Sequence, residues 1–265
     1  GVHSVGGGPL VLEARDGAAD GHWVKWQSED PAHPAVVGAP IKVMGWKPHP
    51  TVKGAFQAPL PSNVTKGSAL RQLWVNGQGA TRPIILGHGR QQGDNKNGFC
   101  LNLSLVEPTA TYPLGSAFDF SAESATDPTT WPNPTDVEFV YTSCDAIDCW
   151  IEPRCTVGQV NGDVVSLKQG DNSTCFHRLY YYPQCFSNGQ GGAWTRGRNP
   201  THLENVASNF SYPGQFYYDR AAATISYIPR AGETMAVVEA TATTATVETI
   251  LVLNRTKNVW FEGIQ

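Results

Sequence analysis

The feature that most constrains this chain's fold is the regular interruption of short apolar runs by Gly, Pro, Asn and Asp. The 27 Gly and 19 Pro end most runs before they reach the length of a helix. Few windows place apolar residues at the i, i+3, i+4 and i+7 positions of an amphipathic helix with caps. The sequence therefore predicts an all-β chain. We expect strands at 8–12, 22–27, 41–46, 71–75, 82–86, 138–141, 164–167, 216–218, 224–228, 236–239 and 249–253.

Turn chemistry supports this prediction. The pairs Asn76-Gly77 and Asn161-Gly162 lie between apolar runs, and such pairs supply the positive φ angles of tight hairpins. Residues 237–247 are ambiguous, because their Ala content favours a helix while alternating Thr and Val favour a strand. We predict a strand there.

Composition excludes several classes of protein. Charged residues make up 16% of the chain and the net charge is -4, so the basic stripe of a nucleic-acid binder is missing. The chain has no run of 18 apolar residues, so its sequence predicts no membrane span. A hydrophobic content of 40% argues against a disordered chain.

Six cysteines predict a disulfide-stapled loop region. From Cys144 onward their spacing does not match paired CxxC zinc ligands, and His177 is the one histidine near them. Free thiols or a metal site are the alternatives, and no metal or cofactor is predicted. Fifteen connectivities exist for six cysteines, and the local pair Cys175–Cys185 is our first choice. The six are Cys100, Cys144, Cys149, Cys155, Cys175 and Cys185.

Asn-x-Ser/Thr sequons are more frequent than the roughly two expected by chance. Together with the cysteines they predict a secreted, extracellular glycoprotein, with coincidence in a chain rich in Asn and Thr as the alternative. Gly1 is expected to begin a mature or processed form. The five acceptor residues are Asn63, Asn102, Asn172, Asn209 and Asn254.

The chain divides into three segments. Residues 1–47 hold strands separated by loops, and residues 48–229 are rich in hairpins and contain all the cysteines. Residues 230–265 return to extended β-structure. Four stretches then carry a family likeness: RQLWVNGQGATRP (71–83), VEFVYTSCDAIDCWIEPRC (137–155), PTHLENVASNFSYPGQFYYDRAAATISYIPRAGETM (200–235) and NVWFEGIQ (258–265).

In this order, the stretches resemble right-handed parallel β-helix proteins of the pectate-lyase-like superfamily, in the branch related to glycoside hydrolases. The resemblance spans about residues 20–265. It implies first coils at 1–47, an inserted, disulfide-stapled antiparallel β-domain at 48–229, and a return to coils at 230–265. Relatives often carry Gly near the position of Ala223, so a looser hairpin is expected here.

The resemblance also implies a partner. Family members continue with many coils, and solenoids need several stacked repeats to bury a core. Strands at 249–253 and 259–261 would otherwise keep an unpaired edge. We expect another polypeptide to complete the β-helix, either the remainder of a processed precursor or an assembly subunit. Family catalytic carboxylates lie on later coils, so no catalytic residue is assigned in this chain.

Three groups of residues are weighed for chemistry. Asp145, Asp148 and Glu152 form an acid cluster, read as a carboxylate pair or cation site or, more simply, as a solvated loop. A group of aromatic residues could stack on sugar rings as a carbohydrate platform or pack in the β-core, and we favour core packing. A turn group is assigned to turn capping and an ion pair. The aromatic group is Tyr180, Tyr181, Tyr182, Phe186 and Trp194, and the turn group is Asp219, Arg220, Arg230 and Glu233.

Two functions remain. The first is the N-terminal part of a glycosidase-like β-helix protein that acts on or binds extracellular polysaccharide, with its catalytic coils on another chain or a missing segment. The alternative is a structural or adhesive β-helix glycoprotein that assembles into a filament, wall or surface appendage. Whether the chain is an enzyme stays open, because fold alone does not decide function.

Overall fold

The computed structural model describes most of the chain as two compact units. The first unit contains Gly1–Lys47, Ala58–Ala80 and Glu233–Gln265, and the second contains Pro48–Gln57 and Thr81–Gly232. Residues 58–80, which the sequence analysis placed in the middle segment, belong to the first unit. The described residues are 2–5, 8–66, 70–87, 101, 103–107, 109–111, 116–141, 152, 154–168, 199–245 and 249–265.

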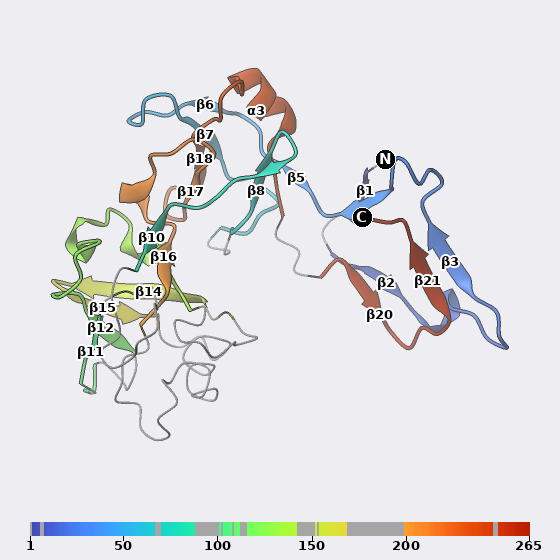
Figure 1. The fold of residues 1–265 in the computed structure, drawn as a ribbon, viewed down its shortest axis with the longest axis horizontal. Coiled ribbons are helices and arrows are strands. Elements are labelled where there is room, and N and C mark those ends of the chain that lie inside the picture. The colour runs from blue at the N-terminus through green and yellow to red at the C-terminus, as the bar shows by residue number, and fades with distance from the viewer. Residues whose placement is uncertain are drawn as a thin grey trace, which may run out of the picture. The chain divides into compact units, whose positions relative to one another are not determined.

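The described residues are mostly β-structure (Figure 1), which confirms the all-β prediction. Helical structure among them consists of one short α-helix and isolated 3-10 turns. These are α3 (Met235–Thr241), η1 (Ala14–Asp16), η2 (Pro128–Thr130), η3 (Pro134–Asp136) and η4 (Ala207–Asn209).

Part of the first unit consists of parallel strand pairs (Figure 1). The chain runs through β1, β2 and β3 and then returns beside β1 as β4. After the long segment between β4 and residue 250, the chain returns beside β2 as β20 and beside β3 as β21. The pairs are β1 (Val2–Ser4) with β4 (Val36–Gly38), β2 (Leu10–Leu12) with β20 (Leu251–Leu253), and β3 (Val24–Gln27) with β21 (Val259–Glu262).

The turns between these strands stack as well. The N–H of Ala18 donates to the carbonyl of Lys257 at 3.0 Å, and the hydroxyl of Thr256 donates to the carbonyl of Leu12 at 2.6 Å. Gly17 lies so close to Lys257 that a Cβ atom there would be 2.4 Å from the Lys257 carbonyl oxygen. Each strand and turn after residue 250 therefore lies directly against its counterpart before residue 30.

A second sheet of this unit is antiparallel, in the order β5 (Ile41–Lys42), β19 (Thr243–Thr244), β8 (Leu73–Val75) and β9 (Gln78–Gly79). The turn between β8 and β9 has φ angles of 51° at Asn76 and 72° at Gly77. The predicted hairpin is thereby confirmed, and the two positive φ angles are those that a tight two-residue turn requires.

The strand predicted at 236–239 is wrong, because these residues form α3. The hydroxyl of Thr234 caps the helix by accepting from the N–H of Val237, and Val238 and Ala242, one turn apart, are fully buried. The carboxylate of Glu239 accepts from the N–H groups of Gly45 and Trp46. Capping and burial of one helical face outweigh the β-propensity of the Thr and Val residues.

The second unit is built on a seven-stranded antiparallel sheet, whose hydrophobic core contains the contacting rings of Phe118, Phe120, Trp131 and Phe139. The predicted hairpin at Asn161-Gly162 joins β14 to β15, with φ 57° at Gly162. In order, the strands are β10 (Ile84–Leu86), β16 (His202–Glu204), β13 (Glu138–Val140), β14 (Arg154–Asn161), β15 (Val164–Leu167), β12 (Ala117–Asp119) and β11 (Ser104–Leu105).

A further four-stranded sheet has the order β17 (Phe216–Asp219), β18 (Thr224–Tyr227), β7 (Phe56–Pro59) and β6 (Lys47–Pro48). Strands β17 and β18 pair fully up to Asp219 and Thr224. Ala223 lies in the turn with φ 54°, the left-handed conformation that glycine occupies more readily. That this hairpin is looser than those of relatives stays a prediction.

Candidate functional site

One face of the seven-stranded sheet carries an unusual concentration of charge. Glu204 on β16 stands directly opposite Glu138 on β13, and His202 and Arg154 lie two positions further along their strands. Since side chains alternate between the two faces of a strand, these residues share one face. The intervening row lies in the hydrophobic core: Ile85, Leu203, Phe139 and Cys155.

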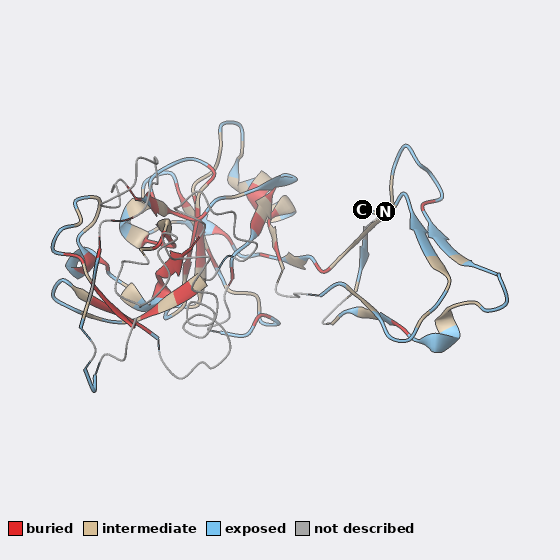
Figure 2. Cartoon of the chain, turned by 60° about the horizontal axis from the view of Figure 1, so that its bottom comes forward, coloured by how far each residue is buried: buried red, intermediate tan, exposed pale blue. Residues whose placement is uncertain are grey.

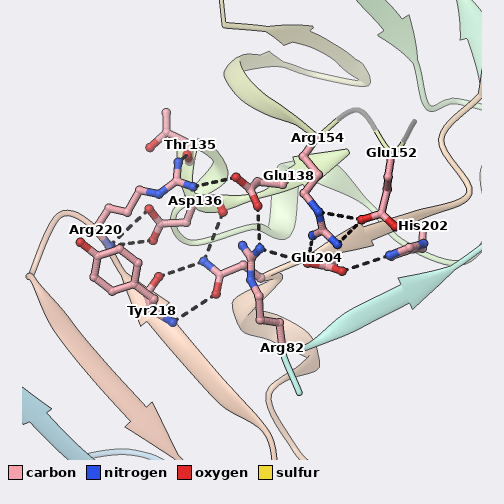
Figure 3. Close-up of polar contacts among 11 residues, drawn as sticks. Arg82, Thr135, Asp136, Glu138, Glu152, Arg154, His202, Glu204, Tyr218 and Arg220 are labelled. Carbon is pink, nitrogen blue, oxygen red and sulfur yellow. Dashed lines mark hydrogen bonds and ion pairs between the residues drawn. The ribbon is translucent and has the colours of Figure 1, made fainter. Parts of the chain in front are cut away.

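Arg82 offsets the electrostatic repulsion between the facing carboxylates of Glu138 and Glu204. Its Nη1 atom lies 2.6 Å from Oε2 of Glu138 and 3.0 Å from Oε2 of Glu204 (Figure 3). Like charges directly opposite in a sheet are destabilising, so a shared cation is needed at this position. Both Arg82 and Glu138 are buried, with side-chain exposures of 4% and 0%.

A second arginine fixes the other oxygen of Glu138. Arg220, in the turn after β17, places Nη2 3.3 Å from Oε1 of Glu138 and donates from Nη1 to the carbonyl of Thr135 at 3.0 Å. With both of its oxygens held and its side chain buried, Glu138 is out of reach of a substrate. Its ion pairs join β13 to the β17–β18 hairpin.

At its other end the network continues from Glu204 to Arg154, Glu152 and His202 (Figure 3). Arg154 bridges Glu204 and the half-exposed Glu152, and Nε2 of His202 lies 3.2 Å from Oε1 of Glu204. Burial works to raise the pKa of Glu204. The hydrogen bond with His202 and the charges of Arg82 and Arg154 outweigh burial and lower that pKa to about 2.

A second hydrogen-bond network adjoins the ion pairs. The hydroxyl of Tyr217 donates to Asp136 at 2.8 Å, and burial raises the pKa of both groups. Asn205 donates to the carbonyls of Asp136 and Tyr218 and accepts from the Tyr218 N–H. The buried polar groups are thus paired across three separate stretches of chain, which fixes their relative positions.

This arrangement does not suit acid–base catalysis. A glycosidase needs one carboxylic acid whose pKa is raised, so that it can protonate the leaving group. Glu204 instead has a lowered pKa, and Glu138 is buried between two arginines. Burial raises the pKa of Asp136, but this residue is buried and its carboxylate accepts from Tyr217 and from the Arg220 N–H, so it does not face a substrate. We therefore assign the network to holding the sheet and the β17–β18 hairpin together.

The predicted modification sites are described in part. Asn63 and Asn254 are exposed, whereas Asn209 is half-buried and donates from its side-chain amide to the carbonyl of Ile84 at 3.1 Å. Asn102 and Asn172 lie outside the described residues. Glycosylation at the five positions stays a prediction.

The predicted cysteine framework also stays a prediction. Cys155 is buried in the hydrophobic core and is disulfide-bonded. Cys100, Cys144, Cys149, Cys175 and Cys185 lie outside the described residues, so the framework and its connectivity are untested.

The other candidate groups are also partly described. Glu152 of the acid cluster is paired with Arg154, while Asp145 and Asp148 lie outside the described residues. The same is true of the aromatic group at 180–194. The structural assignment is confirmed for Asp219, which accepts from the Ala222 N–H at 2.7 Å, and for Arg220 in its ion pair with Glu138.

Two members of the turn group remain. Arg230 donates to the hydroxyl of Tyr227 at 3.0 Å. Glu233 is described, and its assignment to an ion pair stays a prediction.

The charge network is not apparent from the sequence, although its residues lie within the stretches that carry the family likeness. A signal was present at Glu138, which stands between Val137 and Phe139 and so interrupts an apolar strand, whereas Glu204 lies in a mostly polar stretch and gives no such signal. Charged residues are almost never fully buried unless they are paired. Such interruptions therefore indicate buried partners.

The described residues hold no group of three or more His, Cys, Asp or Glu side chains arranged to bind a metal ion. None of the described helices is long and apolar enough to cross a membrane.

Comparison with known proteins finds a likeness in fold. No family model and no curated protein matches the sequence. A solved protein described as a glycoside hydrolase matches with a TM-score of 0.58 and 17% sequence identity. The match covers 100% of this chain and 41% of that chain, so the present chain spans less than half of that protein's length. This chain therefore has a fold similar to part of a glycoside hydrolase.

Proposed function

We propose that this chain is the N-terminal part of a secreted, glycosidase-like β-helix protein that acts on or binds extracellular polysaccharide. Its catalytic coils lie on another chain or on a segment outside these residues. The parallel pairs β1–β4, β2–β20 and β3–β21 are the observation that carries the proposal.

These pairs have the arrangement expected of successive coils of a parallel β-helix. Strands β1, β2 and β3 form one coil, and β4, β20 and β21 form the next, interrupted after β4 by the antiparallel domain. Gln265 then accepts from the N–H of Val37 and donates to the carbonyl of Ala35, so the chain begins a third layer on β4. Right-handedness is part of the proposal.

The edges of the second coil support the proposed partner. Within the described residues, β20 and β21 each pair along one edge. Leu253, Trp26 and Phe261 remain 53%, 38% and 37% exposed, and none of the residues of β3, β20 and β21 is fully buried. Figure 2 shows these strands mainly as exposed or intermediate. A further coil from another polypeptide would pair these edges and cover the apolar side chains.

The glycoside hydrolase likeness supports the carbohydrate-active part of the proposal. Because the identity is 17%, it supports a fold on which many functions occur. The proposed secretion rests on the sequons and the cysteines. Among the sequon asparagines, Asn63 and Asn254 are exposed, as a glycosylation acceptor must be.

The test is to isolate the protein from extracellular fluid together with whatever polypeptide is bound to it. Release of reducing ends is then measured from neutral and acidic polysaccharides, with the 265-residue chain alone as the control. We expect the assembly to release sugars and the chain alone to release none. An assembly that neither binds nor cleaves any polysaccharide would contradict the proposal.

That contrary outcome would favour the second candidate, a structural or adhesive glycoprotein. One observation supports it: the carboxylates of the buried network are held in ion pairs, which suits a scaffold. Electron microscopy of the isolated assembly distinguishes the two, because repeating copies along a fibre are expected of the scaffold.

A further inference from the structure

Two tryptophans are in contact at strands β3 and β21: Trp260 lies on β21, and Trp23 is the residue directly before β3. Phe261 is in register with Trp26, and their rings lie 6.3 Å apart. Trp260, in register with Lys25, therefore points to the other face. Trp23 joins it there, with ring centroids 6.4 Å apart and an interplanar angle of 80°.

The face that carries Trp260 and Lys25 is exposed and partly aromatic. Trp23 is 62% and Trp260 is 55% exposed. At an angle of 80° the edge of one ring meets the face of the other, which leaves both faces of the edge-on ring uncovered by its neighbour. Single exposed apolar residues are ordinary, but two contacting indoles on one sheet face form a contiguous apolar patch, which is a feature of interaction sites.

A neutral ion pair lies on the same face. Nζ of Lys25 is 2.7 Å from Oε2 of Glu262, and the two side chains are 46% and 56% exposed. These groups offer ammonium donors and carboxylate acceptors beside the indole rings. The pairing cancels their charges, so the face attracts neither anions nor cations strongly.

We propose that Trp23 and Trp260 form a binding platform for a neutral oligosaccharide, in which a pyranose ring stacks its C–H face on an indole. Lys25 and Glu262 bind its hydroxyl groups. This inference rests on the proposed carbohydrate-active function and extends it by assigning a ligand class and a site. A sugar ring needs both features found here, a flat apolar surface and adjacent polar groups.

A protein partner fits this face less well. Lys and Glu are depleted from protein–protein interfaces relative to the rest of the surface, yet a Lys–Glu pair lies beside the two rings. An anionic polysaccharide also fits poorly, because Glu262 would repel its carboxylates and Lys25 is already paired. The observations therefore favour an uncharged glycan.

The test measures binding of the 265-residue chain to cellohexaose, laminarihexaose and mannohexaose, with polygalacturonate as the anionic probe, by isothermal titration calorimetry. We expect binding to at least one neutral probe and weaker binding to polygalacturonate. Trp23→Ala and Trp260→Ala should each weaken neutral binding at least about tenfold, and Trp260→Tyr should restore part of it. Tyr212→Ala removes an aromatic side chain that is 69% exposed in the second unit and should leave binding unchanged.

Unchanged melting temperatures would show that the Trp variants fold. Neutral binding that survives in the Trp23→Ala/Trp260→Ala double variant would overturn this site while leaving the proposed function standing. Failure of the wild-type chain to bind any neutral probe would also overturn the site, and the cleavage assay on the intact assembly would still decide the proposed function. Wild-type dimers that dissociate on these substitutions would assign the face to a second copy of the chain instead.

Discussion

At the scale of single residues, the molecule's most consequential feature is the buried contact between Arg82, Glu138 and Glu204. Removing one partner of a buried ion pair leaves an uncompensated charge, at a cost of about 3–5 kcal/mol. We therefore expect Arg82→Met to lower the free energy of unfolding by about that amount, measured by urea denaturation. Arg15→Met is the matched control, because it breaks an exposed pair with Glu13 and should cost less than about 1 kcal/mol. Equal losses in the two variants would contradict the assigned role of Arg82.

Glu204 predicts how stability depends on pH. Its pKa is lowered from 4.5 to about 2 in the folded chain, so the unfolded chain binds more protons between these values. The stabilisation, on the order of 3 kcal/mol, is complete above about pH 4.5 and is lost as the pH falls towards 2. Glu204→Gln should flatten stability over this window, whereas Glu107→Gln, at an exposed position, should keep the wild-type slope. If the stability of the Glu204→Gln variant fell with pH as steeply as that of the wild type, ionisation of Glu204 would not be the cause of the pH dependence.

At the scale of elements, Gly17 tests whether the stacked turns of the parallel pairs depend on close backbone approach. An Ala Cβ at this position would lie 2.4 Å from the carbonyl oxygen of Lys257, which forces the two turns apart. We expect Gly17→Ala to destabilise the first unit by about 1–3 kcal/mol. Gly8→Ala is the control, since nothing lies within 4 Å of its added Cβ. Hydrogen exchange at the amides of β20 and β21 should accelerate in the first variant and stay unchanged in the second.

Elements set by local chemistry were predictable from the sequence, and those set by distant contacts were not. The turn at Asn76-Gly77 follows from the conformations these two residues tolerate. Helix α3 escaped prediction because its stability depends on burial of Val238, which the Thr and Val pattern conceals. The charge network escaped because Arg82 lies 56 residues from Glu138 and 122 from Glu204. Only the strand register brings these side chains together.

At the scale of the whole molecule, the parallel strand pairs are what the proposed β-helix rests on, and the boundaries implied by the resemblance stay a prediction. The proposed partner would bury the edges of β20 and β21 together with Leu253 and Phe261. The most direct measurement is the native mass of the protein isolated from its natural source. The account predicts an assembly heavier than the 28.7 kDa chain, containing further polypeptide that protects the β20 and β21 amides. A solitary 28.7 kDa polypeptide, allowing for attached glycans, with those amides already protected would contradict it.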